Sequence, residues 1–132
     1  MPDTYDVSFL KENVPANTAN QTTSLLGYTS ETEFVAPFAG RISRVRIIMT
    51  EPRTAGTLTL RIQRNGVNMA SPGALLIDDD PAQFLDSIIP ESGADAIAKG
   101  DKLKPLLTTD AGWLPTTSDC IIIISLTGPY TP

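Results

Sequence analysis

The sequence contains no histidine, and this absence removes several kinds of chemistry. Histidine is the commonest general base near neutral pH, completes the Ser-His and Cys-His pairs of nucleophilic enzymes, and serves most zinc sites. Neither a GxGxxG pattern nor a P-loop occurs among the glycines. No pair of carboxylates can be assigned to acid–base catalysis from its spacing. We therefore expect a protein that is not an enzyme and that uses no cofactor.

Cysteine and long apolar runs are scarce as well. Cys120 is the only cysteine, so no disulfide can form within the chain, and its isoleucine neighbours predict a buried, inert thiol. The run that it begins, residues 120–124, is the longest apolar one and is far shorter than the roughly 20 residues of a membrane-spanning helix. The N-terminus lacks the basic start and apolar core of a signal peptide. We expect no membrane contact and no passage through an oxidising compartment.

Positive charge is limited and unevenly distributed. The chain has 132 residues and a formal net charge of −5, which argues against nonspecific binding to nucleic acid. All six arginines lie between residues 41 and 64, where Glu51 is the only acid, so this window has a net charge of +5. The rest of the chain has four lysines against fourteen acids. A short basic segment therefore lies within an acidic protein.

Eleven prolines and nine glycines separate short apolar runs, which is typical of many short strands joined by tight turns. The clearest strand is TLTLRIQR, residues 57–64, followed by Asn65-Gly66, the strongest short hairpin signal. Further strands are expected at residues 23–29, 33–36, 41–50, 67–69, 74–77, 102–108 and 120–126. The sequence predicts an all-β fold, an antiparallel β-sandwich or jelly roll of about eight strands, with at most one short helix.

A helix and a strand compete at residues 80–90. Asp80-Pro81-Ala82-Gln83 matches a helix N-terminus, and Phe84, Leu85 and Ile88 could form one helical face, although a strand fits nearly as well. The adjoining Asp78-Asp79-Asp80 could offer oxygen ligands to a cation, but its spacing matches no EF-hand loop, so a solvated loop is the simpler interpretation.

The chain is expected to form one compact domain. Residues 1–32 would supply an N-terminal strand and an extended arm, and residues 33–132 would form the β-sandwich. Residues 11–24 are polar and aperiodic, which indicates an extended arm or a mobile loop. The strand at residues 120–126, CIIIISL, is apolar on both faces, as expected of a central strand. Its outer face needs a cover, which could be the arm or a neighbouring subunit.

The arginines have a possible role in binding. Strand parity places Arg44 and Arg46 on one face with Ile42 and Ile48. Apolar residues at both parities suggest a bulge, or a strand covered partly on both sides. If strands 41–50 and 57–64 pair, Arg61 joins them on one surface. Such a surface could meet an acidic protein partner, could simply be solvated, or could meet a polyanion. Trp113 could belong to the core or to an interface.

Four stretches carry a resemblance to a known family: FVAPFAG at 34–40, TLTLRIQRNG at 57–66, AKGDKLKP at 98–105 and CIIIISLTG at 120–128. With these in place, residues 33–127 resemble the small jelly-roll proteins that decorate bacteriophage capsids, which are related in pattern to C1q- and TNF-like heads. The resemblance implies a homotrimer, assembled in the host cytoplasm, on the outer surface of a virion. Its partner would be the major capsid protein, the N-terminal arm would act as a strap, and no residue would be catalytic.

These considerations lead to one expectation and one alternative. The expected protein is a capsid decoration or cement protein that bridges coat subunits, with Arg44, Arg46, Arg61 and Trp113 as its protein-interaction residues. The alternative is a trimeric head of a phage fibre, which would bind a receptor or glycan through loops 51–56, 71–82 or 109–119. Direct binding of nucleic acid is not expected in either case.

Overall fold

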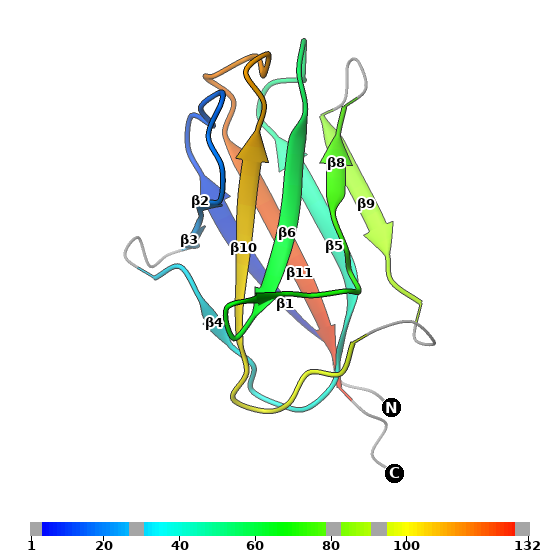
Figure 1. Ribbon diagram of the computed structural model, residues 1–132. Helices are drawn as coiled ribbons and strands as arrows, with labels where there is room; N and C mark the ends of the chain where they lie inside the picture. The colour runs from blue at the N-terminus through cyan, green and yellow to red at the C-terminus, as the bar shows by residue number, and fades with distance from the viewer. Residues whose placement is uncertain (1–3, 27–30, 79–82, 91–94, 129–132) are drawn as a thin grey trace.

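The computed structural model describes residues 4–26, 31–78, 83–90 and 95–128, which form a sandwich of two antiparallel sheets (Figure 1). No helix occurs in these residues. They therefore contain no helix that is long and apolar enough to cross a membrane. Eleven strands are found there, against about eight expected, and four of them are pairings of only two residues. The predicted all-β sandwich is confirmed.

The first sheet, which we call the β11 sheet, has the strand order β3-β1-β11-β5-β9. Its members are β1 (Thr4–Lys11), β3 (Ser24–Leu25), β5 (Arg41–Met49), β9 (Phe84–Ile88) and β11 (Cys120–Thr127). The isoleucine-rich β11 lies in the middle, between β1 and β5, as its two apolar faces indicate.

The second sheet, the β10 sheet, has the order β2-β10-β6-β7, with β4 also paired to β10 and β8 to β6. Its members are β2 (Gln21–Thr22), β4 (Phe34–Val35), β6 (Leu58–Arg64), β7 (Val67–Asn68), β8 (Leu75–Ile77) and β10 (Lys102–Thr109). From β5 onwards the chain changes sheet between β5 and β6, between β8 and β9, and at the two connections that follow, which is typical of a jelly roll.

The core lies between the sheets because every second residue of the long strands is apolar. Leu58 and Leu60 of β6 and Ile122 and Ile124 of β11 are all fully buried. Complete burial of such a side chain stabilises the fold by about 1.5–3 kcal/mol relative to leaving it exposed. Trp113, in the loop before β11, is the largest buried side chain and fills the same core.

A bulge in β5 corrects one expectation. Arg44 lies opposite Ser125 and Ile42 lies opposite Leu126, so that Ser43 is an extra residue on β5. The parity of the strand changes at this point, and Ile42 is buried in the core instead of sharing a face with Arg44. A bulge was one of the two alternatives that the sequence left open, and the expected position of Ile42 on the outer face is wrong.

The hairpin predicted at Asn65-Gly66 is confirmed. Both residues have positive φ, 54° and 84°, as a two-residue hairpin turn of the primed type requires. Across this turn Arg64 pairs with Val67. The turn fixes the register of the second sheet at its β7 edge.

Residues 84–88 form a strand, so the helical alternative is wrong for them. Phe84–Ile88 pairs with β5 and alternates, with Leu85 packed against the core and Phe84 and Ile88 exposed. Pairing with β5 satisfies backbone groups at the edge of the sheet, and this tertiary contact outweighs the local helix signal. The expected helix start at Asp80–Ala82, together with Asp79, lies outside the described residues.

Residues 11–24, expected to form an extended arm, instead follow the sandwich closely. Val14 is fully buried, and its backbone N–H donates a hydrogen bond to the Ser118 carbonyl at 3.0 Å. The Asn17 N–H donates to the Asp110 carbonyl at 2.8 Å. This segment therefore packs along the end of the sandwich, where its one large apolar side chain is buried.

Candidate functional site

The outer side of the β11 sheet carries a row of apolar side chains, which we call the β11 face. Register places Leu10, Ile121, Ile48 and Phe84 side by side across β1, β11, β5 and β9. Three of them are half-buried, while Phe84 is 55% exposed. Ile123 lies one row away on β11 and is also half-buried. These side chains therefore remain partly accessible.

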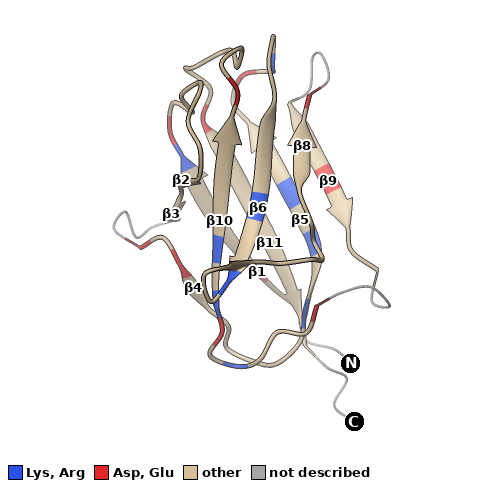
Figure 2. Cartoon of the chain, viewed as in Figure 1, with Lys and Arg blue, Asp and Glu red and all other residues tan. Residues whose placement is uncertain are grey.

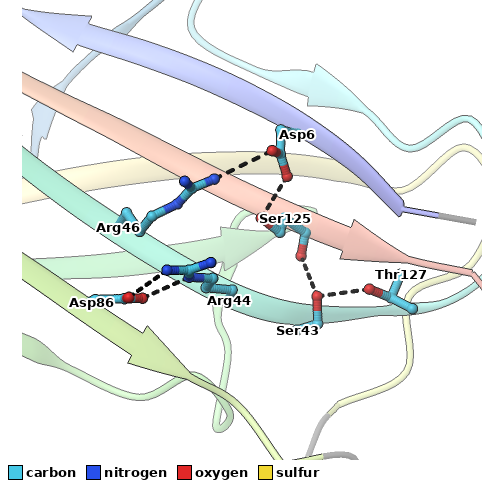
Figure 3. A network of polar contacts seen from close by, with 7 residues as sticks. All are labelled: Asp6, Ser43, Arg44, Arg46, Asp86, Ser125 and Thr127. Atoms are coloured by element: carbon cyan, nitrogen blue, oxygen red, sulfur yellow. Dashed lines mark hydrogen bonds and ion pairs between the residues drawn. The ribbon is translucent and has the colours of Figure 1, made fainter.

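Polar residues complete this face with ion pairs (Figure 3). Arg44 of β5 forms a bidentate contact with Asp86 of β9, with Nε–Oδ1 and Nη2–Oδ2 distances of 2.7 and 2.5 Å. Because Asp86 accepts these hydrogen bonds, its pKa lies below the ordinary value, and the same contact raises the pKa of Arg44. The two charges neutralise each other at the edge of the face.

The second ion pair spans three strands. Arg46 of β5 donates a hydrogen bond to Oδ2 of Asp6 on β1 at 3.2 Å, reaching over β11 between them. The other Asp6 oxygen, Oδ1, accepts a hydrogen bond from the Ser125 hydroxyl at 2.5 Å. Asp6 is thus held by one residue of β11, the adjacent strand, and by one residue of β5, the strand beyond it, and the charge of Arg46 is compensated within the chain.

Hydroxyl groups continue this network to the bulge. The Thr127 hydroxyl donates to the Ser43 hydroxyl oxygen at 2.7 Å, and the Ser43 hydroxyl donates to the Ser125 carbonyl at 3.3 Å. Figure 3 shows these contacts as a continuous series that ends at Arg46. The extra residue of the bulge is therefore fixed by the hydroxyl groups beside it.

The structure separates the three arginines that were expected to share a surface. Arg44 and Arg46 lie on the β11 sheet, whereas Arg61 lies on β6 in the β10 sheet and points to the opposite side of the sandwich. Strands 41–50 and 57–64, whose pairing was the condition for a shared surface, do not pair, because the chain crosses between the sheets at the turn that joins them. Whether any of the three contacts a partner stays a prediction.

Most of the remaining positive charge of residues 41–64 is bound within the chain. Arg41 donates to the Ile89 carbonyl at 3.0 Å, and Arg64 donates to the Ala96 carbonyl. Arg53 donates to the Gly56 carbonyl. The basic segment is thus largely structural, since its guanidinium groups bind backbone oxygens and carboxylates of the same chain.

Trp113 belongs to the core. Its side chain is 0% exposed, so the alternative of an interface residue is wrong for a chain in this fold. Its indole Nε1 has no hydrogen-bond partner in the described part of the chain. The backbone around Trp113 is packed closely: a Cβ added to Gly56 would lie 2.3 Å from the Trp113 amide nitrogen.

The described residues contain no cluster of three or more acidic, cysteine or histidine side chains that could hold a metal ion. Cys120 is buried, as predicted, and burial raises the pKa of its thiol to about 12.

Sequence reasoning missed the partners of these surface charges. Asp6 and Asp86 lie 40 and 42 residues from the arginines that they bind, and no local pattern connects them. Lys102 and Lys104 were also missed, although they alternate on a predicted strand, KLKPLLTT, in the way that marks one outward face. That alternation was the available signal.

The chain is similar to several solved structures at low sequence identity. The globular domain of zebrafish complement 1qA protein is 13% identical with a TM-score of 0.47, covering 98% of this chain and 100% of that one. A chain of the Israeli acute paralysis virus particle is 8% identical with a TM-score of 0.44, covering 96% and 71%. Eiger TNF from S. frugiperda is 11% identical with a TM-score of 0.39, covering 100% and 98%.

No protein-family model matches the chain, and no curated protein matches it. With identities of 13% or less and TM-scores below 0.5, the structural similarities carry no conclusion about function or assembly.

Proposed function

We propose that this chain is a non-enzymatic structural protein of a bacteriophage particle. It binds the outer surface of the capsid as a homotrimer and stabilises the capsid by bridging coat subunits. The observation that supports self-association is the accessible apolar row of the β11 face. The placement on a capsid rests on the resemblance of the strand and turn pattern to capsid decoration proteins.

The β11 face has the composition of a contact between copies. Ile88 and Phe84 are 73% and 55% exposed, and large accessible apolar side chains around a half-buried row are costly to leave in water. The charges beside them are already paired within the chain. Burying them in an interface therefore leaves no charge without a partner, which lowers the cost of desolvation.

Bridging would stabilise a capsid by mass action. A ligand that binds the assembled coat and not its separated subunits shifts the equilibrium towards assembly. A stable contact of this kind buries roughly 1,200–2,000 Å² in total. Each bound trimer then adds contacts that must break before coat subunits separate.

Light scattering tests the trimer. The wild-type protein should have three times the 14.1 kDa mass of the chain. Ile88→Asp should shift the mass towards the monomer, because it places a charge on the apolar face at an exposed position that does not support the fold. Leu76→Asp, on the opposite sheet, is the matched control and should leave the mass unchanged. A wild-type monomer at micromolar concentration would contradict the trimer.

Binding assays test the role of the trimer. Saturable binding to expanded phage capsids, together with a higher temperature of capsid disruption, is the expected result. Reproducible binding to a glycan array without capsid binding would instead favour the head of a phage fibre.

A further inference from the structure

The outer side of the β10 sheet carries cations without matching anions. Strands β6 and β10 contain Arg61, Arg64, Lys102 and Lys104 and no acidic residue. Figure 2 shows this as blue positions along both strands with no red between them. In a chain of net charge −5, this is an unusual concentration of one sign.

Three of these cations share one surface, which we call the β10 face. Arg61 lies opposite Leu106 and Lys104 lies opposite Gln63, so the two cations are diagonal neighbours on adjacent strands. Such neighbours are about 7–8 Å apart. Lys102 precedes Lys104 by two residues on the same side of β10, which places it roughly 7 Å away along the strand.

The charges of the β10 face are not compensated within the described residues. Among the described residues, the arginines in ion pairs are Arg44 and Arg46, and both lie on the β11 sheet. Arg64 differs from its neighbours, because its guanidinium binds the Ala96 carbonyl. Arg61, Lys102 and Lys104 are therefore the cations available to a partner.

Apolar side chains flank these cations on both edges of the sheet. Val35 of β4 pairs with Lys102 and is 55% exposed, and Leu76 of β8 pairs with Thr59 and is 43% exposed. A surface that combines arginine with accessible apolar groups is typical of a protein contact. It is less typical of a face that only meets solvent.

We propose that the β10 face docks an acidic surface segment of a protein partner, with carboxylates of the partner bound by Arg61, Lys104 and Lys102. The identification of that partner as the coat protein rests on the proposed function, whereas the docking chemistry does not. Because the β10 and β11 faces lie on opposite sides of the sandwich, self-association through one leaves the other free.

A protein partner fits this face better than a nucleic acid. Three cations match two or three carboxylates, while a nucleic acid brings a continuous series of phosphates and needs a longer basic path. Beyond the patch, such a strand would meet Glu33 next to β4 and Asp101 before β10. The net negative charge of the chain would oppose it further.

Fluorescence anisotropy with a labelled twelve-residue peptide of alternating glutamate and serine tests the inference. The wild-type chain should bind this peptide at low salt and lose affinity as salt screens the charges. The triple variant Arg61→Gln/Lys102→Gln/Lys104→Gln should weaken binding by about tenfold or more, given about two- to fivefold for each exposed pair. Lys11→Gln, which removes a cation from the β11 sheet, is the control and should change affinity less than about twofold.

Three results would overturn the proposal. The first is no binding of the peptide to the wild-type chain, and the second is equal affinity of the triple variant. The third is binding of a twelve-nucleotide thymidine strand as tight as that of the peptide with the same loss in the triple variant, which would make the face a general polyanion site. Thermal unfolding of the triple variant confirms that it folds.

Light scattering of the same samples separates this inference from the proposed function. A trimer that does not bind the peptide contradicts only the docking face. A monomer that binds the peptide, with the loss expected in the triple variant, contradicts only the trimer.

Discussion

Arg46 on β5 and Asp6 on β1 form an ion pair over the strand that separates them, with 3.2 Å between Nη2 and Oδ2. The contact joins the two neighbours of β11, which do not hydrogen-bond to each other through their backbones. Together with the Ser125 hydroxyl on β11 itself, it connects three strands through one carboxylate. The Asp6 carboxylate therefore helps to fix the register of the three strands, in addition to pairing with a surface charge.

This geometry predicts a small, salt-dependent effect of removing Asp6. The carboxylate is largely exposed, and exposed ion pairs contribute about 0–1 kcal/mol. Asp6→Asn should therefore lower the free energy of unfolding by less than about 1 kcal/mol at low salt, with a smaller difference at high salt. Urea unfolding at two salt concentrations measures this. Glu12→Gln, an exposed acid just beyond β1, is the control; a loss as large in that variant would contradict a specific role for Asp6.

The Arg44–Asp86 pair predicts a pH dependence of stability. An aspartate in the unfolded chain titrates near about pH 3.9, and in the folded chain the hydrogen bonds from Arg44 hold the pKa of Asp86 lower. The stabilisation by the ion pair is therefore fully present at pH values above the pKa of Asp86 in the unfolded chain. It is lost as the pH falls through the pKa of Asp86 in the folded chain. Asp86→Asn should be less stable than wild type near neutral pH, and this difference should disappear in strong acid.

A double-mutant cycle isolates this effect. In an Arg44→Gln background, the ion pair is already absent. Adding Asp86→Asn to that variant should therefore remove no further pH-dependent stability that depends on the pair. NMR titration of the Asp86 carboxyl should show its pKa rising towards the ordinary value in Arg44→Gln. An unchanged pKa there would show that Arg44 is not the cause.

Two neighbouring isoleucines of β11 should respond differently to truncation. Ile122 is fully buried, so Ile122→Ala should cost about 2–5 kcal/mol of unfolding free energy by leaving a cavity. Ile123 is half-buried on the outer face, and Ile123→Ala should cost clearly less. Urea unfolding of both variants measures the comparison. Equal losses would mean that the outer face is covered more completely than a single chain shows.

Two glycines with positive φ form a matched pair. Gly66, at +84°, has no atom within 4 Å of an added Cβ, so Gly66→Ala should cost only the strain of the left-handed backbone, about 1–2 kcal/mol. Gly56, at +75°, would place its Cβ against the Trp113 backbone. Gly56→Ala should therefore be more destabilising than Gly66→Ala in thermal or urea unfolding. The reverse order would mean that the loop holding Trp113 moves aside easily.

The strands could be predicted from the sequence because their signals are local. Alternation in TLTLRIQR and the Asn65-Gly66 turn depend on neighbouring residues, and both are found as expected. The residues 84–88 were ambiguous because the decisive pairing is with β5, about 40 residues away. A local pattern cannot contain that contact.

The surfaces were harder to predict than the strands. Parity correctly put Arg44 and Arg46 on one side of β5, but assigning Arg61 required knowing whether the chain stays in one sheet at Pro52–Gly56. A short turn with proline and glycine serves a hairpin and a crossover equally well. Similarly, whether a guanidinium is free or paired depends on carboxylates such as Asp6 and Asp86, which only the folded chain brings near.

The bulge at Ser43 has a consequence for how β5 tolerates a change of length. Arg44 and Ile42 already face consecutive residues of β11, so deleting Ser43 would leave an unbroken ladder and the same core. The hydroxyl contacts of Ser43 would be lost, together with the hydrogen bond that its carbonyl accepts from the Ile89 N–H at 2.9 Å. Deleting a residue between Val45 and Met49 would instead shift the register by one residue, so that the side chains on one side of the deletion would move from the core face to the outer face and the reverse. Ser43 is thus a residue that β5 accommodates as an insertion, and the strand can lose it without reversing its two sides.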